Sequence, residues 1–233
     1  PIVRDMLDAE RKNKYFIRKS SYDALKKPIK SFKENALVQH LTAMFKSNGQ
    51  GNGIEAYEQP HLHVEVVDLE TSELVGYMHG KLDYLIIDFN HNEVYIPDVK
   101  TTEEHLEHYT GSNTGSYFIR GRWHKLKNYR QLALYKLLVM ALLEKRGYNP
   151  DLFTYYLGNI VTETNRNSFN RTKWIPCPEA YVSLGITETF RVFELFYKTI
   201  NNNYESELII PVSNAIVNPT SISKMDTSEF DSE

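Results

Sequence analysis

Apolar and polar positions divide the first part of the chain into helical and flexible stretches. Between residues 20 and 47, apolar side chains recur near helical spacing, and Ser20 and Ser21 can cap the start of a helix. Pro28 interrupts this stretch, so we expect two short helices that meet there. Glycines alternate with polar residues over 48–53, which predicts a flexible loop.

Three extended segments follow this loop. Residues 61–68 and 93–99 alternate between apolar and polar side chains, and residues 74–88 are rich in apolar and aromatic ones. The triplet Asn90-His91-Asn92 is typical of a turn between the last two segments. The pattern therefore predicts an antiparallel meander.

The second half of the chain mixes both kinds of pattern. It predicts, in order, a polar loop holding a short helix (101–121), a helix (123–145), a strand (152–162), a polar excursion (165–173) and an amphipathic helix (187–201). Together these elements predict an α/β fold with a central mixed β-sheet flanked by helices.

Length and composition predict one domain. A chain of 233 residues is long enough for one sizeable core but short for two full domains, so we expect a single domain over 1–220. Residues 221–233 are acidic and rich in serine, which predicts a disordered tail. No apolar run is long enough to span a bilayer, so we expect no membrane association.

The single cysteine limits the chemistry that the chain can carry. Cys177 alone can form neither an internal disulfide nor a cysteine-built metal cluster, and we expect it to pack in the core. The charged residues 1–13 lack the apolar segment of a secretory signal. A reducing cytoplasm is therefore the expected compartment.

The net charge of −3 argues against nucleic-acid binding, but the charges are unevenly placed. The tail is acidic, whereas a short interior window is basic. Trp123 lies in that window, and cations beside an aromatic ring suit phosphate contact with base stacking, although a solvated helix start would look similar. The cations expected to contact a nucleic acid are Arg120, Arg122, Lys125 and Lys127.

Two carboxylates and an ammonium group are candidates for a catalytic centre. If the strands around the 90–92 turn pair, Asp83 and Asp98 reach the same end of the sheet, and side-chain alternation puts Lys100 on the face of Asp98. Oxygen ligands of this kind hold Mg²⁺ or Mn²⁺, which activates water for attack on a phosphodiester. A lysine can orient that water or stabilise the charge that develops on the phosphate.

Three sequence motifs contain or accompany these residues. Gly80-x-x-Asp83, Asp98-x-Lys100-Thr101 and Gln131-x-x-x-Tyr135 occur in that order. They resemble the PD-(D/E)XK nuclease superfamily, and within it the RecB-type and phage-type exonuclease branch.

The resemblance implies a restriction-endonuclease-like core and metal-dependent hydrolysis of DNA, in DNA recombination or repair. By similarity, Asp83 and Asp98 bind the metal, the carbonyl of Val99 is a third ligand, and Lys100 is catalytic. Further residues implied by similarity are His40 as a metal ligand and Gln131 and Tyr135 as substrate contacts. A DNA-processing protein partner is also expected.

Several alternatives stay open. His40 could be an ordinary helix histidine, and Gln131 and Tyr135 could be packing neighbours on one helix face. The chain could also be an inactive nuclease fold that binds a nucleic acid or a protein, or a structure-specific or RNA-directed nuclease. The strand pair His61 and His63 is expected to be structural. All nuclease readings require Asp83 and Asp98 to converge.

Overall fold

A computed structural model describes most of the chain. The described residues are 19–49, 51–67, 74–110, 121–164 and 171–201. Arg120 and the predicted tail at 221–233 lie outside them. The elements are α2 (Lys19–Glu34), α3 (Ala36–Lys46), β1 (Ile54–Glu58), β2 (His61–Val67), β3 (Leu74–Lys81), β4 (Tyr84–Asp88), β5 (Glu93–Thr102), α4 (Leu106–Thr110), α5 (Arg122–Lys125), α6 (Asn128–Lys145), a 3₁₀ turn (Pro150–Leu152), β6 (Thr154–Glu163), β7 (Thr172–Pro176) and α7 (Glu179–Asn201).

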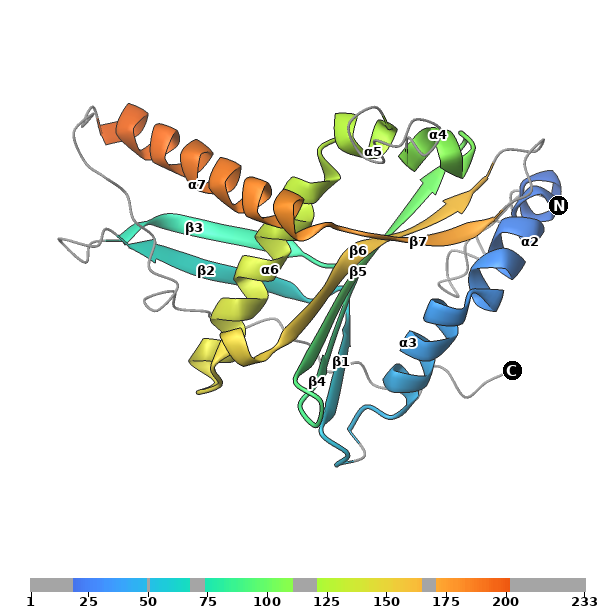
Figure 1. Ribbon diagram of the computed structural model, residues 1–233, viewed down its shortest axis with the longest axis horizontal. Coiled ribbons are helices and arrows are strands. Elements are labelled where there is room, and N and C mark those ends of the chain that lie inside the picture. Colours follow the sequence, from blue (N-terminus) through green and yellow to red (C-terminus); the bar gives the residue numbers. More distant parts are fainter. Residues whose placement is uncertain (1–18, 50, 68–73, 111–120, 165–170, 202–233) are drawn as a thin grey trace, which may run out of the picture.

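The centre of the fold is a twisted mixed sheet of five strands in the order β1-β4-β5-β6-β7 (Figure 1). Strands β5 and β6 are parallel, and the other neighbours are antiparallel. A parallel pair needs a crossover connection, which is supplied here by the segment that contains α4, α5 and α6. Helices flank this sheet, so the predicted α/β class is confirmed.

A bent ribbon joins the sheet to a second, two-stranded sheet. The pairing of β2 with β3 continues the register in which β1 pairs with β4, because Glu58 lies opposite Tyr84 and His61 lies opposite Lys81. Between them, Gln59 has a left-handed backbone with φ of 48°, and its N–H donates to the carbonyl of Asp83 at 2.8 Å. The ribbon bends at this point, which places Asp83 at the corner between the two sheets.

The predicted meander is confirmed in its pairings but was incomplete. Strand β3 pairs with β2, β4 pairs with β5, and the turn after Asp88 joins the last two. The sequence pattern predicted one strand over 74–88 and did not predict β1. The bend divides one antiparallel ladder into two halves, β1 with β4 and β2 with β3, which lie in different sheets.

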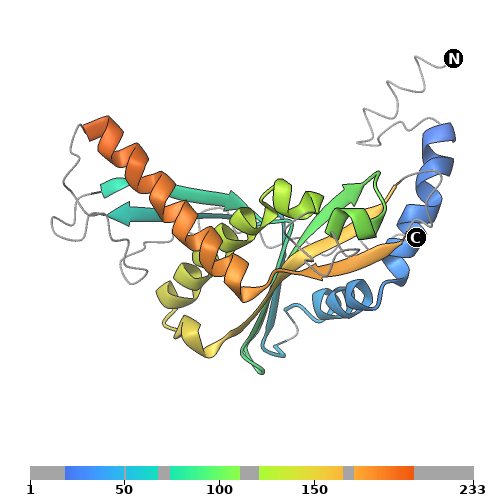
Figure 2. The same cartoon turned by 45° about the horizontal axis from the view of Figure 1, so that its top comes forward.

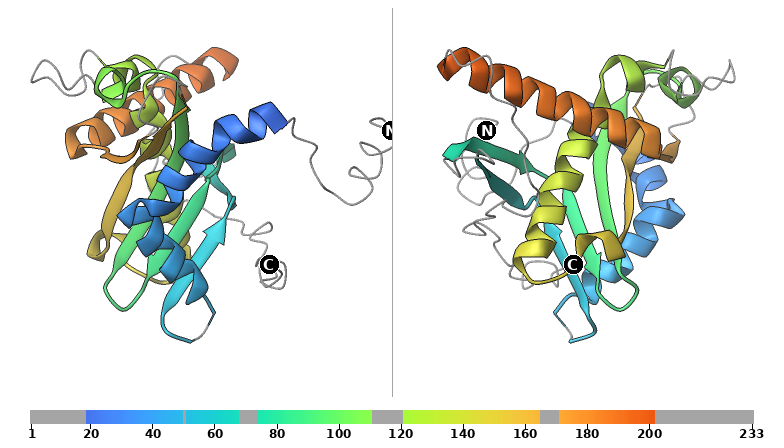
Figure 3. Two further views of the ribbon diagram at one scale, coloured as in Figure 1. Left: turned by 90° about the vertical axis from the view of Figure 1, so that its right-hand side faces the viewer. Right: turned by 60° about the vertical axis from the view of Figure 1, so that its left-hand side comes forward.

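Helices cover both faces of the five-stranded sheet (Figures 2 and 3). Helices α2 and α3 lie on one face, where Val38, Leu41 and Met44 pack with Ile86 and Ile160. Helix α6 lies on the other face, with α7 packed against it, and it also contacts β2 and β3. The larger core lies between α6 and both sheets.

The expected helix junction at Pro28 is wrong. Helix α2 runs through Pro28, which is buried, and the junction lies at Asn35. The Asn35 side chain caps α3 by accepting hydrogen bonds from the N–H groups of Leu37 and Val38, and it donates to the carbonyl of Thr172 at 3.1 Å. The capping hydrogen bonds of Asn35 set the boundary between α2 and α3. Pro28 removes only one hydrogen bond from α2, which is not enough to end the helix there.

Other boundaries also differ from the pattern. The helix predicted over 123–145 is two helices, because Lys127 adopts a left-handed backbone with φ of 53° between α5 and α6. Helix α7 begins eight residues before the predicted start at Thr187, since it begins at Glu179. Strand β7 was missed, because its first residues fall in the segment predicted to be a polar excursion. Among the described residues, no helix is long and apolar enough to cross a membrane.

Candidate active site

Asp83 and Asp98 converge at the corner of the ribbon. The register of β4 and β5 pairs Ile86 with Tyr95, and its continuation sets Asp83 opposite Asp98. The Asp83 carboxylate accepts a hydrogen bond from the N–H of Val99 at 2.7 Å. The spatial requirement of the nuclease hypothesis is therefore met.

Lys100 completes the predicted group. Its ammonium nitrogen lies 3.0 Å from Oδ1 and 2.8 Å from Oδ2 of Asp98, on the same face of β5. The Asp98 side chain is only 2% exposed, whereas that of Lys100 is 31% exposed. The ammonium group thus lies between a buried carboxylate and solvent.

Burial makes the Asp98 carboxyl harder to ionise. Burial raises the pKa of the Asp98 carboxyl, and the charge of Asp83 raises it further, whereas hydrogen bonds from Lys100 and Asn159 lower it; the net direction is upward. Burial is the largest cause of this shift. An added divalent cation would favour the ionised form of Asp98.

The Val99 carbonyl lies on the edge that faces Asp83. The N–H and C=O of one strand residue point to the same side, and the Val99 N–H points to Asp83. Two carboxylates and one carbonyl are hard oxygen donors, so Asp83, Asp98 and Val99 fit a Mg²⁺ or Mn²⁺ ion.

Gln131 and Tyr135 extend the site along α6. The Lys100 ammonium donates to Oε1 of Gln131 at 3.3 Å, and Nε2 of Gln131 donates to the Tyr135 hydroxyl at 2.6 Å. That hydroxyl donates in turn to the carbonyl of Lys81 at 2.7 Å. The chain of hydrogen bonds joins α6 to the end of β3 and holds Lys100 in place.

Asn159 is a functional candidate that the sequence did not indicate. Its Nδ2 donates to Oδ2 of Asp98 at 2.6 Å, and its Oδ1 accepts from the indole N–H of Trp123 at 2.6 Å. Asn159 and Trp123 are fully buried. The expectation that Trp123 stacks on bases is therefore wrong, because a buried ring with a bonded indole cannot meet a ligand.

The remaining basic window is only partly available. Arg122 pairs with Glu104 at 2.9 Å, and both side chains are more than two-fifths exposed. Lys125 and Lys127 are exposed. Arg120 lies outside the described residues.

His40 is not brought to the carboxylates. It is exposed on α3, and its ring meets the edge of Tyr95 with centroids 5.9 Å apart. Tyr95 lies on the face of β5 opposite to Asp98. In the described part of the chain, no hydrogen bond or ion pair joins His40 to Asp83 or Asp98.

A cleft of about 1090 Å³ opens beside Asp83. Helices α2 and α3 form one wall, through Phe32, Lys33 and Lys46 among others, and Asp83 and Val99 lie on the opposite wall. The cleft therefore gives a ligand much larger than an ion access to Asp83 and Val99, whereas Asp98 and Lys100 are not among its lining residues.

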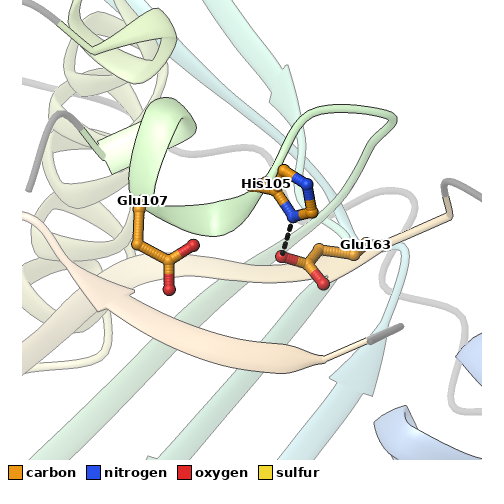
Figure 4. Close-up of side chains that lie close together, drawn as sticks. All are labelled: His105, Glu107 and Glu163. Atoms are coloured by element: carbon orange, nitrogen blue, oxygen red, sulfur yellow. Dashed lines mark ion pairs between the residues drawn. The ribbon is translucent and has the colours of Figure 1, made fainter. Parts of the chain in front are cut away.

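A second group of possible metal ligands lies farther along the same face. Ligand atoms of His105, Glu107 and Glu163 lie within 4.8 Å of one another and could hold a metal ion (Figure 4). Glu163 pairs in register with Thr102, four residues beyond Asp98, which is roughly 13 Å along the strand. Both carboxylates already bind the guanidinium of Arg171 at 2.7 to 2.9 Å, so a metal would compete with this arginine.

The structure also shows where Cys177 and the pair His61 and His63 lie. Cys177 packs between two hydrophobic clusters, and burial raises the pKa of its thiol to about 12. His63 lies opposite His79 on the face of the small sheet that points away from the core, and His61 lies two residues before it.

A scan against models of protein families finds no match for this chain, and neither does a search of curated proteins.

Proposed function

We propose that this protein is a metal-dependent deoxyribonuclease that hydrolyses DNA phosphodiester bonds as an exonuclease. The observation that carries the proposal is the convergence of Asp83, Asp98 and Lys100, which is held by the Asp83–Val99 hydrogen bond and the Asp98–Lys100 ion pair. The adjoining cleft supports it, since a polymer in the cleft would reach Asp83 and Val99.

The residues of the chain have separable tasks in this proposal. Asp83, Asp98 and the Val99 carbonyl would hold Mg²⁺ or Mn²⁺, which when bound polarises the phosphate and lowers the pKa of water. Lys100 stabilises negative charge on the phosphate as the bond to the leaving oxygen breaks. Gln131 positions the Lys100 ammonium, and Tyr135 positions Gln131. Asn159 fixes one oxygen of Asp98.

The basic window has a secondary place in the proposal. Lys125 and Lys127 are exposed, and we assign them weak contacts with phosphates outside the site. Arg122 would have to exchange Glu104 for a phosphate, which lowers its net contribution.

End-labelled oligonucleotides test the proposal. Single-stranded DNA, duplex DNA and RNA, labelled at either end, are incubated with the purified chain and Mg²⁺ or Mn²⁺. An exonuclease releases mononucleotides from one end, whereas an endonuclease produces internal fragments. We expect DNA cleavage that EDTA abolishes and that Lys100→Ala reduces by roughly 10²–10³-fold.

Lys173→Ala is the matched control, because Lys173 is an exposed lysine of the same sheet. It should cleave at the rate of the unmodified chain. If the folded chain cleaves no DNA with either metal, or if Lys100→Ala retains full activity, the proposal is wrong. Cleavage of RNA but not of DNA would show that the substrate is RNA.

A further inference from the structure

The wall of the cleft beside Asp83 is basic. Lys33 of α2 and Lys46 of α3 both line the cleft and are exposed. Asp83 is the only acidic side chain among its described lining residues. A ligand that carries several negative charges therefore meets two cations and one carboxylate in this cleft.

The positive charge continues on the other side of α2. A second cleft, of about 610 Å³, is lined by Lys27, Lys30 and Glu34, and by Arg171, which is already paired with Glu107 and Glu163. Lys30 pairs only loosely with Glu34, at 3.7 Å with both side chains more than three-fifths exposed. Helix α2 thus presents lysines to both clefts, and these cations would attract a polyanion.

The rest of the large cleft is mainly apolar. Ile29, Phe32, Val38 and Tyr84 line it, and Ile29 is 44% exposed although it is a large apolar side chain. Base faces are apolar and aromatic, but a duplex hides them inside its stack. Cations next to apolar side chains therefore suit an unpaired strand better than a duplex.

We propose that this cleft binds single-stranded DNA, with Lys33 and Lys46 on its phosphates and the apolar side chains on its bases. The inference rests on the proposed function and names its substrate form. The strand lies between α2–α3 and the sheet, with a phosphate beside Asp83 and Val99, which line the cleft. The 122–127 window lies beyond the cleft and is not part of its lining.

Binding can be measured without cleavage. Fluorescence anisotropy in EDTA compares a single-stranded oligonucleotide with a blunt duplex, for the unmodified chain and for Lys33→Gln/Lys46→Gln. We expect the double variant to bind the single strand about tenfold more weakly. The slope of log affinity against log salt should fall by about 1.4, since each phosphate contact on a single strand contributes about 0.7.

Two double variants serve as comparisons with the same change in charge. Lys145→Gln/Arg191→Gln alters α6 and α7, on the opposite face of the sheet, and should bind within about twofold of the unmodified chain. Lys125→Gln/Lys127→Gln alters the 122–127 window and should weaken binding less than the cleft variant. Thermal unfolding of each variant verifies its fold.

The outcomes separate this inference from the nuclease proposal. Unchanged affinity in Lys33→Gln/Lys46→Gln, a larger loss in the 125/127 variant, or tighter binding of the duplex would each overturn the cleft assignment, even if DNA is cleaved. Conversely, if the cleft variant loses single-strand binding but the unmodified chain cleaves no DNA, the cleft assignment stands and the nuclease proposal fails.

Discussion

The Asp98 side chain is held by two donors, and one of these is itself held by a third residue. Lys100 contacts both carboxylate oxygens, Asn159 donates to one of them, and the Asn159 amide is itself held by Trp123. Burial nevertheless raises the pKa of Asp98, so ionising this residue costs free energy in the folded protein. A group that costs stability and is still fully positioned is typical of a functional site.

Gly80 gives a test of the packing behind this site. A Cβ at position 80 would lie 2.8 Å from Cδ1 of Leu138 and 3.0 Å from Cε1 of Tyr135. The Tyr135 ring cannot move away easily, because its hydroxyl bonds Lys81 and Gln131. We expect Gly80→Ala to lower the free energy of unfolding by about 1–3 kcal/mol in urea titrations and to slow DNA cleavage.

Gly76→Ala is the control on the same strand. The nearest atom to a Cβ there is Cζ of Phe193, at 3.3 Å, at the end of a side chain that can turn. Its cost should be clearly smaller than that of Gly80→Ala. Equal losses from the two substitutions would show that close packing on Tyr135 is not what requires the glycine.

At the scale of elements, alternation and turns predicted the hairpin of β4 and β5, and with it the meeting of Asp83 and Asp98. Asp83 and Asp98 are only fifteen residues apart in the sequence, and a short turn joins their strands. Asn159 was not predictable in this way, because β6 reaches Asp98 only through a parallel pairing 61 residues away. The register of such a pairing is set by the crossover helices, which local patterns do not specify.

Helix α7 is anchored on α6 by an ion pair whose strength should depend on pH. The Arg130 guanidinium bonds Glu188, and together with the Tyr129 hydroxyl it lowers the pKa of the Glu188 carboxyl to about 2. A carboxyl whose pKa is depressed by folding adds stability above its ordinary pKa of 4.5, and this contribution is lost as the pH falls toward 2.

Arg130→Gln should therefore destabilise the protein at pH 7 and progressively less below pH 4.5. The pair is partly exposed, with side chains 40% and 27% accessible, so we expect a loss below about 1 kcal/mol. Urea unfolding at pH 7, 5, 4 and 3 measures the difference from the unmodified chain. A difference of the same size at pH 3 and pH 7 would contradict this assignment of the pair.

At the scale of the whole molecule, two groups of oxygen and nitrogen ligands lie on one face of the sheet. Asp83 of the first group borders the large cleft, whereas the carboxylates of the His105–Glu107–Glu163 group hold Arg171. Arg171 links β7 to α4 through Glu107 and to β6 through Glu163, so the second group has a structural task without a metal. The two groups should therefore respond differently to added cations.

Thermal unfolding with and without Mn²⁺ distinguishes them. A ligand that binds only the folded state stabilises it by about 2.7 kcal/mol when its concentration is 100 times Kd. We expect Mn²⁺ to raise the Tm of the unmodified chain and of His105→Ala, because the latter keeps Asp83 and Asp98. Asp83→Asn should abolish the rise, because it removes a charged ligand while its amide keeps the oxygen that accepts from Val99. A rise that survives Asp83→Asn but disappears in His105→Ala would place the metal in the second group, and the proposed catalytic role of Lys100 would lose its physical basis.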